Sequence, residues 1–144
     1  GVPSNVFWNF KACRQENVSL IAYSPLAGGV LSGKYLEEQR PEGARFSKYL
    51  AMGGRQAAMA GRFINAKTLA STARFMDIAQ RAGLAPVTLA TAWSKQHDFV
   101  ASTIVGATRV DQLDDIFAAA EVVLSAEVMT EIDKVTTEIR YPMG

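Results

Sequence analysis

The sequence predicts an α/β fold with parallel strands, because two short apolar segments are each followed by a loop and a helical pattern, with further helices between them. The chain has 144 residues, of which 49% are hydrophobic, which is enough for one packed core. Two parallel strands alone cannot close a sheet or cover both of its faces. We therefore expect further strands to come from sequence upstream of this chain.

The first half is expected to contain the end of a helix, one strand and a long loop. Residues 6–16 have a helical pattern, and "VSLIAYS", residues 18–24, has the character of a strand. The strand is expected to end near Ser24, because Pro25 cannot donate to a sheet ladder. Residues 36–63 are polar and Gly-rich without a steady period, which predicts a long functional loop with room for a short helix. The strand residues expected to be buried are Val18, Ile21 and Tyr23.

The second half is expected to contain four helices and a second strand. Residues 65–82 predict an amphipathic helix, and Pro86 suits the first turn of the next one. The β-branched residues 99–105 predict the second strand. Thr108 and Ser125 are expected to cap the last two helices. The side chains expected to face inward are Leu69, Ala73, Met76, Ala79, Leu89, Ala90, Trp93, Leu113, Ile116, Phe117, Ala120, Val128, Ile132, Val135 and Ile139.

Composition and charge disfavour several classes of function. A net charge of +1 gives no broad field for nucleic acid or an anionic membrane surface. One cysteine, Cys13, and one histidine, His97, do not supply a disulfide framework or a metal cluster, and His97 is expected to be a surface or helix-capping residue. No apolar segment approaches the roughly 18 residues of a membrane helix, and no secretion signal is recognisable. We expect a cytoplasmic protein without a metal.

The stretch "SPLAGGVLSGKY", residues 24–35, has the spacing of a phosphate-binding P-loop in all but one position. Gly28, Gly33 and Lys34 fit that motif, but Tyr35 stands where a Ser or Thr is needed to hold Mg²⁺. A Pro and a Gly also follow too soon for the long helix that opens at a true P-loop. A nucleoside triphosphatase is therefore disfavoured.

A second interpretation of this stretch is a site for a phosphorylated aromatic ligand. Tyr23 would offer a ring for stacking, Ser24 a hydroxyl, and Lys34 with Arg45 two positive charges. The plainer alternative, a core Tyr23 and a solvated Lys34, stays open on this segment alone.

The end of the second expected strand has matching features. In "TIVGATRVDQL" the small residues Gly106 and Ala107 allow close approach of a ligand. Thr108 and Arg109 follow at an expected helix start, where amides and the helix dipole favour phosphate. The last two strand ends of barrels with alternating strands and helices commonly form such a site. Two suitable strand ends favour one phosphorylated ligand bound by both.

The motifs "IAYSPLAGGVLSGKY", "PEGARF" and "STIVGATRVDQL" resemble the C-terminal half of aldo-keto reductases, in particular the bacterial oxidoreductase branch related to potassium-channel β subunits. The resemblance covers nearly the whole chain. It implies that residues 1–144 are the C-terminal part of a (β/α)8 TIM barrel domain, incomplete at its N-terminus, with the last two parallel strands and their flanking helices. It also implies an NADP(H)-dependent oxidoreductase that reduces aldehydes and ketones to alcohols.

The resemblance implies cofactor-binding roles along the chain, one group of positions for each part of NADP(H). Tyr23 matches the residue that stacks on nicotinamide, and a loop along the pyrophosphate is matched by Ser24, Pro25, Leu26 and Gly28. Basic residues that embrace the cofactor from the long loop are matched by Lys34 and Arg45. The strand end that holds the adenosine phosphate is matched by Gly106, Ala107, Thr108 and Arg109, and the adenine end by Gln112 and Asp115.

The same resemblance implies that the Asp, Tyr, Lys and His of hydride transfer lie on earlier strands. No residue of this chain is therefore assigned a catalytic role, and the isolated chain is expected to lack turnover. Arg109 is the expected local partner of a 2′-phosphate, because Gly106 stands where some members have Lys. Two alternatives remain: a cofactor-sensing regulatory module, and a structural fragment whose motifs are relics. The sequence leaves the carbonyl substrate and the oligomeric state open.

Overall fold

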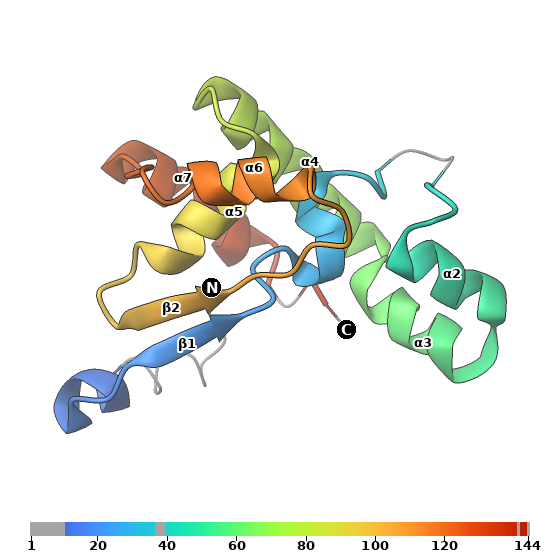
Figure 1. Ribbon diagram of the computed structural model, residues 1–144, viewed down its shortest axis with the longest axis horizontal. Coiled ribbons are helices and arrows are strands. Elements are labelled where there is room, and N and C mark those ends of the chain that lie inside the picture. The colour runs from blue at the N-terminus through green and yellow to red at the C-terminus, as the bar shows by residue number, and fades with distance from the viewer. Residues whose placement is uncertain (1–10, 37–39, 141, 144) are drawn as a thin grey trace.

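The computed structural model describes residues 11–36, 40–140 and 142–143, and its centre is a two-stranded parallel sheet (Figure 1). Strand β1, Leu20–Tyr23, pairs with strand β2, Val100–Ile104. The predicted parallel α/β fold is thereby confirmed. The helix expected over residues 6–16 is present over 11–16, and its first part lies outside the described residues.

Helices follow both β1 and β2, as the alternating pattern predicts. Their bounds are η1 Ala27–Ser32, α2 Arg45–Met52, α3 Gly54–Phe63, α4 Ala66–Arg81, α5 Pro86–Lys95, α6 Gln112–Ala118 and α7 Ala126–Glu138. Two expected helix N-termini are confirmed: Pro86 is the first residue of α5, and the Ser125 hydroxyl caps α7 by accepting a hydrogen bond from the Val128 amide. Within the described parts of the chain, no helix has the length and apolar character needed to span a membrane.

Residues 36–63 are not mainly a loop, and that prediction is wrong. They contain α2 and α3, which form a hairpin set apart from the other helices in Figure 1. The turn between them is made at Gly53, with a φ of 72°. Each helix has one buried residue, Phe46 in α2 and Ala60 in α3. Such short helices with so few inward residues leave no clear apolar period in the sequence.

Two hydrophobic clusters stabilise the fold. The main core consists of Phe75, Ile78, Ala79, Leu89, Ala90, Ala92, Ala119, Leu124, Ile132 and Val135. A smaller hairpin cluster, which consists of Val30, Tyr35, Phe46 and Ala60, joins the α2–α3 hairpin to η1. The expected inner face of α4 was misplaced: Ala73 is exposed, and the buried residues are Thr68, Thr72, Phe75, Ile78 and Ala79. Threonines in this face obscured its position in the apolar pattern.

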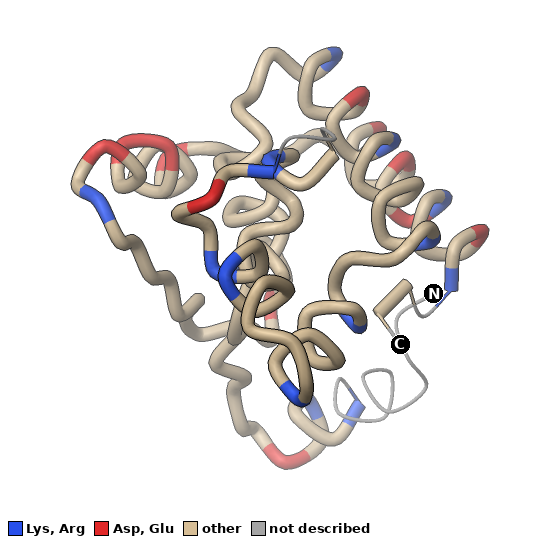
Figure 2. The backbone as a smooth tube through the Cα atoms, turned by 90° about the vertical axis from the view of Figure 1, so that its right-hand side faces the viewer, with Lys and Arg blue, Asp and Glu red and all other residues tan. Residues whose placement is uncertain are grey.

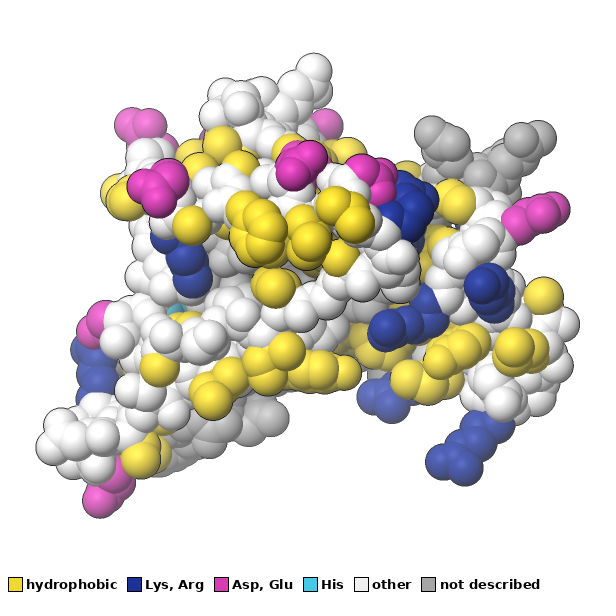
Figure 3. All heavy atoms as spheres, viewed as in Figure 1, with side chains coloured by type: hydrophobic (Ala, Val, Ile, Leu, Met, Phe, Trp, Pro, Cys, Tyr) yellow, Lys and Arg dark blue, Asp and Glu magenta, His cyan; other side chains and the backbone are white. Residues whose placement is uncertain are grey.

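The strand residues that we expected to be buried are exposed. Ile21 is 61% and Tyr23 81% exposed, and Val18 precedes the strand and is also exposed. The reason is that helices cover one face only, with α5 packed on β2, so that alternate residues of β1 point away from them. An apolar strip follows the strands in Figure 3, and a second patch lies over α6. Phe117 and Ala120, also expected inside, are exposed on α6 or just beyond it.

Candidate functional site

The carboxyl ends of β1 and β2 lie at the same edge of the sheet. Tyr23 is opposite Ile104 in the parallel ladder, so Ser24 and Gly106 both follow directly beyond that edge. Ser24 has a φ of 58°, which is uncommon for a residue with a side chain. Its Oγ accepts a hydrogen bond from the Gly28 amide at 3.2 Å. This contact fixes the path of the chain as it leaves β1.

Glycines let the next segment pack closely against two side chains. Gly28 and Gly29 have φ values of 68° and 95° within η1. A methyl group at Gly28 would lie 2.6 Å from the Phe46 ring, and one at Gly29 would lie 2.8 Å from Lys34 Nζ. The short helix η1 also occupies the centre of the supposed P-loop, and Tyr35 is buried in the hairpin cluster. Both features agree with the sequence, which disfavours a P-loop.

Two cations from other segments of the chain, Arg45 and Arg109, lie within electrostatic reach of Lys34. Burial lowers the pKa of Lys34, and the positive charges of Arg45 and Arg109 lower it further. In Figure 3, Lys and Arg side chains (dark blue) lie where the α2–α3 hairpin meets the rest of the molecule, and Figure 2 shows the Lys and Arg positions along the backbone. Like charges held together disfavour the charged state unless an anion is present. This cation cluster, Lys34, Arg45 and Arg109, is suited to a multiply charged anion.

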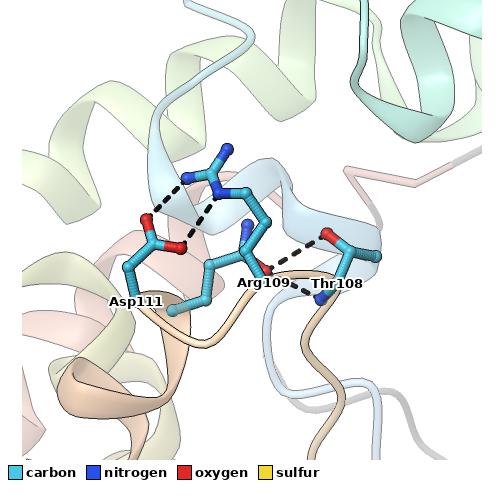
Figure 4. A network of polar contacts seen from close by, with 4 residues as sticks. Thr108, Arg109 and Asp111 are labelled. Carbon is cyan, nitrogen blue, oxygen red and sulfur yellow. Dashed lines mark hydrogen bonds and ion pairs between the residues drawn. The ribbon is translucent and has the colours of Figure 1, made fainter.

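Arg109 forms a bidentate ion pair with Asp111 (Figure 4). Nε donates to Oδ1 at 3.0 Å and Nη2 to Oδ2 at 2.8 Å. The hydrogen bonds raise the pKa of Arg109 and lower that of Asp111. The guanidinium has further N–H donors outside this pairing. Asp111 therefore orients Arg109 without using all of its donors.

Thr108 does not cap α6, so that prediction is wrong. The helix begins at Gln112, its N-cap is Asp111, and the Asp111 side chain makes no capping hydrogen bond. Instead, the amide and hydroxyl of Thr108 both donate to Gln112 Oε1, at 2.9 and 3.3 Å. The turn that contains Arg109 and Val110 delays the helix, which places Thr108 and Arg109 in a loop rather than in the first turn.

The other expected site residues surround the cation cluster less directly. Pro25 and Leu26 are half-buried, Leu26 against the main core, whereas Gly106 and Ala107 are exposed. Asp115 is also exposed, and its carbonyl accepts a hydrogen bond from the Thr88 hydroxyl. Tyr23 lies on the uncovered face of the sheet, and within the described residues no ring contact or hydrogen bond links it to the cation cluster.

Sequence reasoning missed three residues that support the site: Tyr35, Phe46 and Asp111. The Asp111 pairing had a local signal, since a carboxylate two residues after Arg109 can reach its guanidinium. Tyr35 and Phe46 had none, because their contact spans eleven residues and depends on burial.

No group of three potential metal ligands occurs among the described residues. His97 follows α5, as expected, but its ring is half-buried, 4.9 Å from the Trp93 ring and 5.3 Å from the Phe99 ring. Burial lowers its pKa, against the opposing effect of Asp133 and Asp98. His97 is thus part of an aromatic cluster, edge-to-face with Trp93 and stacked on Phe99, and it precedes β2, away from the carboxyl ends of the strands.

Fold and site together define a parallel α/β chain in which cationic residues follow the carboxyl ends of adjacent strands. Residues 9–137 match the family model described as "Aldo/keto reductase family". The chain is thus a member of the aldo/keto reductase family.

Individual relatives agree with this assignment. Protein tas of Escherichia coli (strain K12) is 39% identical over 130 residues, which are 88% of this chain and 34% of that protein. A putative voltage-gated potassium channel subunit beta of Schizosaccharomyces pombe is 31% identical over 126 residues, 83% of this chain and 35% of that protein. L-glyceraldehyde 3-phosphate reductase of Escherichia coli O157:H7 is 30% identical over 122 residues, 84% of this chain and 34% of that protein. The chain spans about a third of the length of these relatives.

Proposed function

We propose that this chain is the cofactor-binding part of an NADP(H)-dependent oxidoreductase that reduces aldehydes or ketones to alcohols. The observation that carries the proposal is the cation cluster, in which Lys34, from the segment after β1, lies within electrostatic reach of Arg45 at the start of α2 and of Arg109 after β2. Membership of the aldo/keto reductase family supports it, as does similarity to a protein named a reductase.

We further propose that residues 1–144 are the C-terminal part of a (β/α)8 barrel, incomplete at the N-terminus, in which β1 and β2 are the last two strands. Their parallel pairing supports this proposal. So does the apolar face of β1, which no helix of the described residues covers. A parallel sheet is normally buried on both faces, so the exposed Ile21 and Tyr23 suit a position inside a larger protein.

The chemistry of the side chains fits a dinucleotide phosphate. The cation cluster supplies positive charge, Ser24 and Thr108 supply hydroxyls, and the exposed Tyr23 ring offers a surface for nicotinamide. The proposed contacts along the cofactor are Tyr23, Ser24, Pro25, Leu26, Gly28, Lys34, Arg45, Gly106, Ala107, Thr108, Arg109, Gln112 and Asp115. When bound, NADP(H) supplies the hydride for carbonyl reduction. The residues of this chain bind and orient it, and none is proposed to be catalytic.

Titration of the chain with NADPH tests the proposal. Lys34→Ala and Arg45→Ala are each expected to raise the Kd about ten- to a hundredfold, because a hydrogen bond to a charged group contributes roughly 1.5–3 kcal/mol. Lys67→Ala is the control, since Lys67 is an exposed cation at the start of α4, outside the cluster. Saturable binding that responds to the cluster variants and not to the control supports the function; equal Kd values for all of them contradict it.

Cofactor affinity is also expected to fall at alkaline pH. The pKa of Lys34 is lowered from 10.5 in the folded chain, so its amine loses its proton at a lower pH than an unfolded lysine. Below the lowered pKa Lys34 is charged and attracts phosphate, and above it that attraction is lost. The Kd should therefore rise with pH through a window below 10.5. Lys34→Arg, which stays charged, is expected to flatten this rise, and an equally steep rise in that variant would assign it to another group.

The same shift predicts a change in stability of the ligand-free chain. Since the unfolded chain binds more protons than the folded one between the two pKa values, the free energy of unfolding should increase with pH across that window. Urea midpoints measured at several pH values, compared with those of Lys34→Arg, report this contribution.

A further inference from the structure

We propose that Tyr35 is a positioning residue that fixes Lys34 and Arg45 relative to each other, so that both cations face one phosphate-bearing ligand. This inference rests on the proposed function. Two different parts of the Tyr35 side chain carry it, the hydroxyl and the ring.

The Tyr35 hydroxyl caps helix α2 from outside the helix. The residue at the N-cap of α2 is Ala44, which has no side-chain acceptor for the unpaired amides of the first turn. The Tyr35 hydroxyl instead accepts a hydrogen bond from the Phe46 amide at 3.2 Å, in a buried position. Arg45 is the first residue of α2 and directly precedes Phe46. The hydroxyl therefore anchors the turn that carries Arg45.

The Tyr35 ring contacts the other cation. Lys34 Nζ lies 5.3 Å from the centroid of the ring, within the range of a cation–π interaction. The ring has little freedom, because Tyr35 is 1% exposed and its centroid lies 5.7 Å from that of Phe46. One buried side chain thus interacts with both the Lys34 amine and the start of α2.

Electrostatics explain why such a support is needed. Lys34 and Arg45 repel each other: the pKa of Lys34 is lowered chiefly by burial and further by the charge of Arg45. Unsupported, the exposed Arg45 would move away from the half-buried amine in the absence of an anion. A fixed Tyr35 keeps both charges in place for a ligand, which lowers the entropy lost on binding.

The variant Tyr35→Phe separates the two contacts, because it removes the hydroxyl and keeps the ring beside Lys34. NADPH titration of the wild-type chain, Tyr35→Phe, Arg45→Ala and the double variant forms a double-mutant cycle. We expect Tyr35→Phe to raise the Kd about three- to tenfold, and the double variant to bind no more weakly than Arg45→Ala alone. A parallel cycle with Lys34→Ala is expected to be additive, since the ring contact survives.

Additive effects of Tyr35→Phe and Arg45→Ala would overturn the proposal, because a merely structural hydroxyl weakens binding equally with or without Arg45. Hydrogen exchange of the ligand-free chain gives a second readout: the Phe46 amide is expected to exchange at least about tenfold faster in Tyr35→Phe, with α4 unchanged. Unchanged exchange would also overturn it. If wild-type NADPH binding is absent or insensitive to Arg45→Ala, the proposed function itself fails, and the role of Tyr35 fails with it. If Arg45→Ala weakens binding and Tyr35→Phe does not, only the role of Tyr35 fails.

Discussion

Replacing Phe46 by Ala is expected to lower the free energy of unfolding of the α2–α3 hairpin by about 3–5 kcal/mol, the usual range for a buried Phe. Phe46 is 1% exposed and lies at the centre of the hairpin cluster. Its ring packs against three others, with centroids 5.7 Å away at Tyr35, 6.1 Å at Tyr49 and 4.9 Å at Phe63. Replacement by Ala would remove all three ring contacts and leave a cavity in the hairpin cluster.

The loss is expected to be local before it is global. The hairpin cluster is separate from the main core, and it is the cluster that holds the α2–α3 hairpin on η1. Amides of α2 and α3 should therefore lose protection from hydrogen exchange while those of α4 and α5 keep theirs. Because Arg45 begins α2, NADPH affinity is expected to fall together with this protection.

Phe117→Ala is the matched control for this prediction. Phe117 is 65% exposed on α6, so its removal should change the free energy of unfolding by no more than about 0.5 kcal/mol. Urea unfolding followed by circular dichroism, together with hydrogen exchange, measures both variants. Equal effects of the two substitutions would contradict the packing role that we assign to Phe46.

The fold was predictable where a long segment carries a steady period. Helices α4, α5 and α7 follow from such patterns, and Ser125 caps α7 as expected. Both strands follow instead from short apolar, β-branched runs that end near Pro or Gly. The α2–α3 hairpin did not follow, because burial of Phe46 and Ala60 depends on η1, a partner that no local pattern reveals. The exposure of Ile21 and Tyr23 was not predicted for a related reason. Their apolar side chains are typical of a buried strand, but no described residues cover that face of β1.

The charged residues of the candidate site could be predicted from the sequence, but the residues that position them could not. The charges of Lys34, Arg45 and Arg109 and their order along the chain are visible in the sequence, and in the structure both arginines lie within electrostatic reach of Lys34. The residues that hold them, Tyr35 and Asp111, act through a buried hydroxyl and an ion pair that depend on the folded chain. Positioning contacts of this kind are set by tertiary packing rather than by local spacing.

Gly28→Ala is expected to destabilise the chain by about 2–5 kcal/mol, the sum of a left-handed backbone cost of roughly 1–2 and an overpacking cost of roughly 1–3. Gly28 has a φ of 68°, which disfavours any residue with a Cβ. The new methyl group would also lie 2.6 and 2.7 Å from two atoms of the Phe46 ring. Either the ring or η1 must move.

Movement of the Phe46 ring is expected to reach the cation cluster. The Phe46 ring contacts both Gly28 and the Tyr35 ring, and the Phe46 amide donates a hydrogen bond to the Tyr35 hydroxyl. A displaced ring would weaken that hydrogen bond and release the start of α2, where Arg45 lies. We therefore expect Gly28→Ala to raise the Kd for NADPH as well as to lower the urea midpoint.

Gly43→Ala provides the control, since Gly43 lies outside the left-handed region and a methyl group there meets nothing within 4 Å. It should leave the urea midpoint and the Kd nearly unchanged, or raise stability slightly by restricting the unfolded chain. A Gly28→Ala variant with wild-type stability would show that the Phe46 ring can shift at little cost. In that case close packing at Gly28 could not be what holds the α2–α3 hairpin, and Arg45 with it, beside η1.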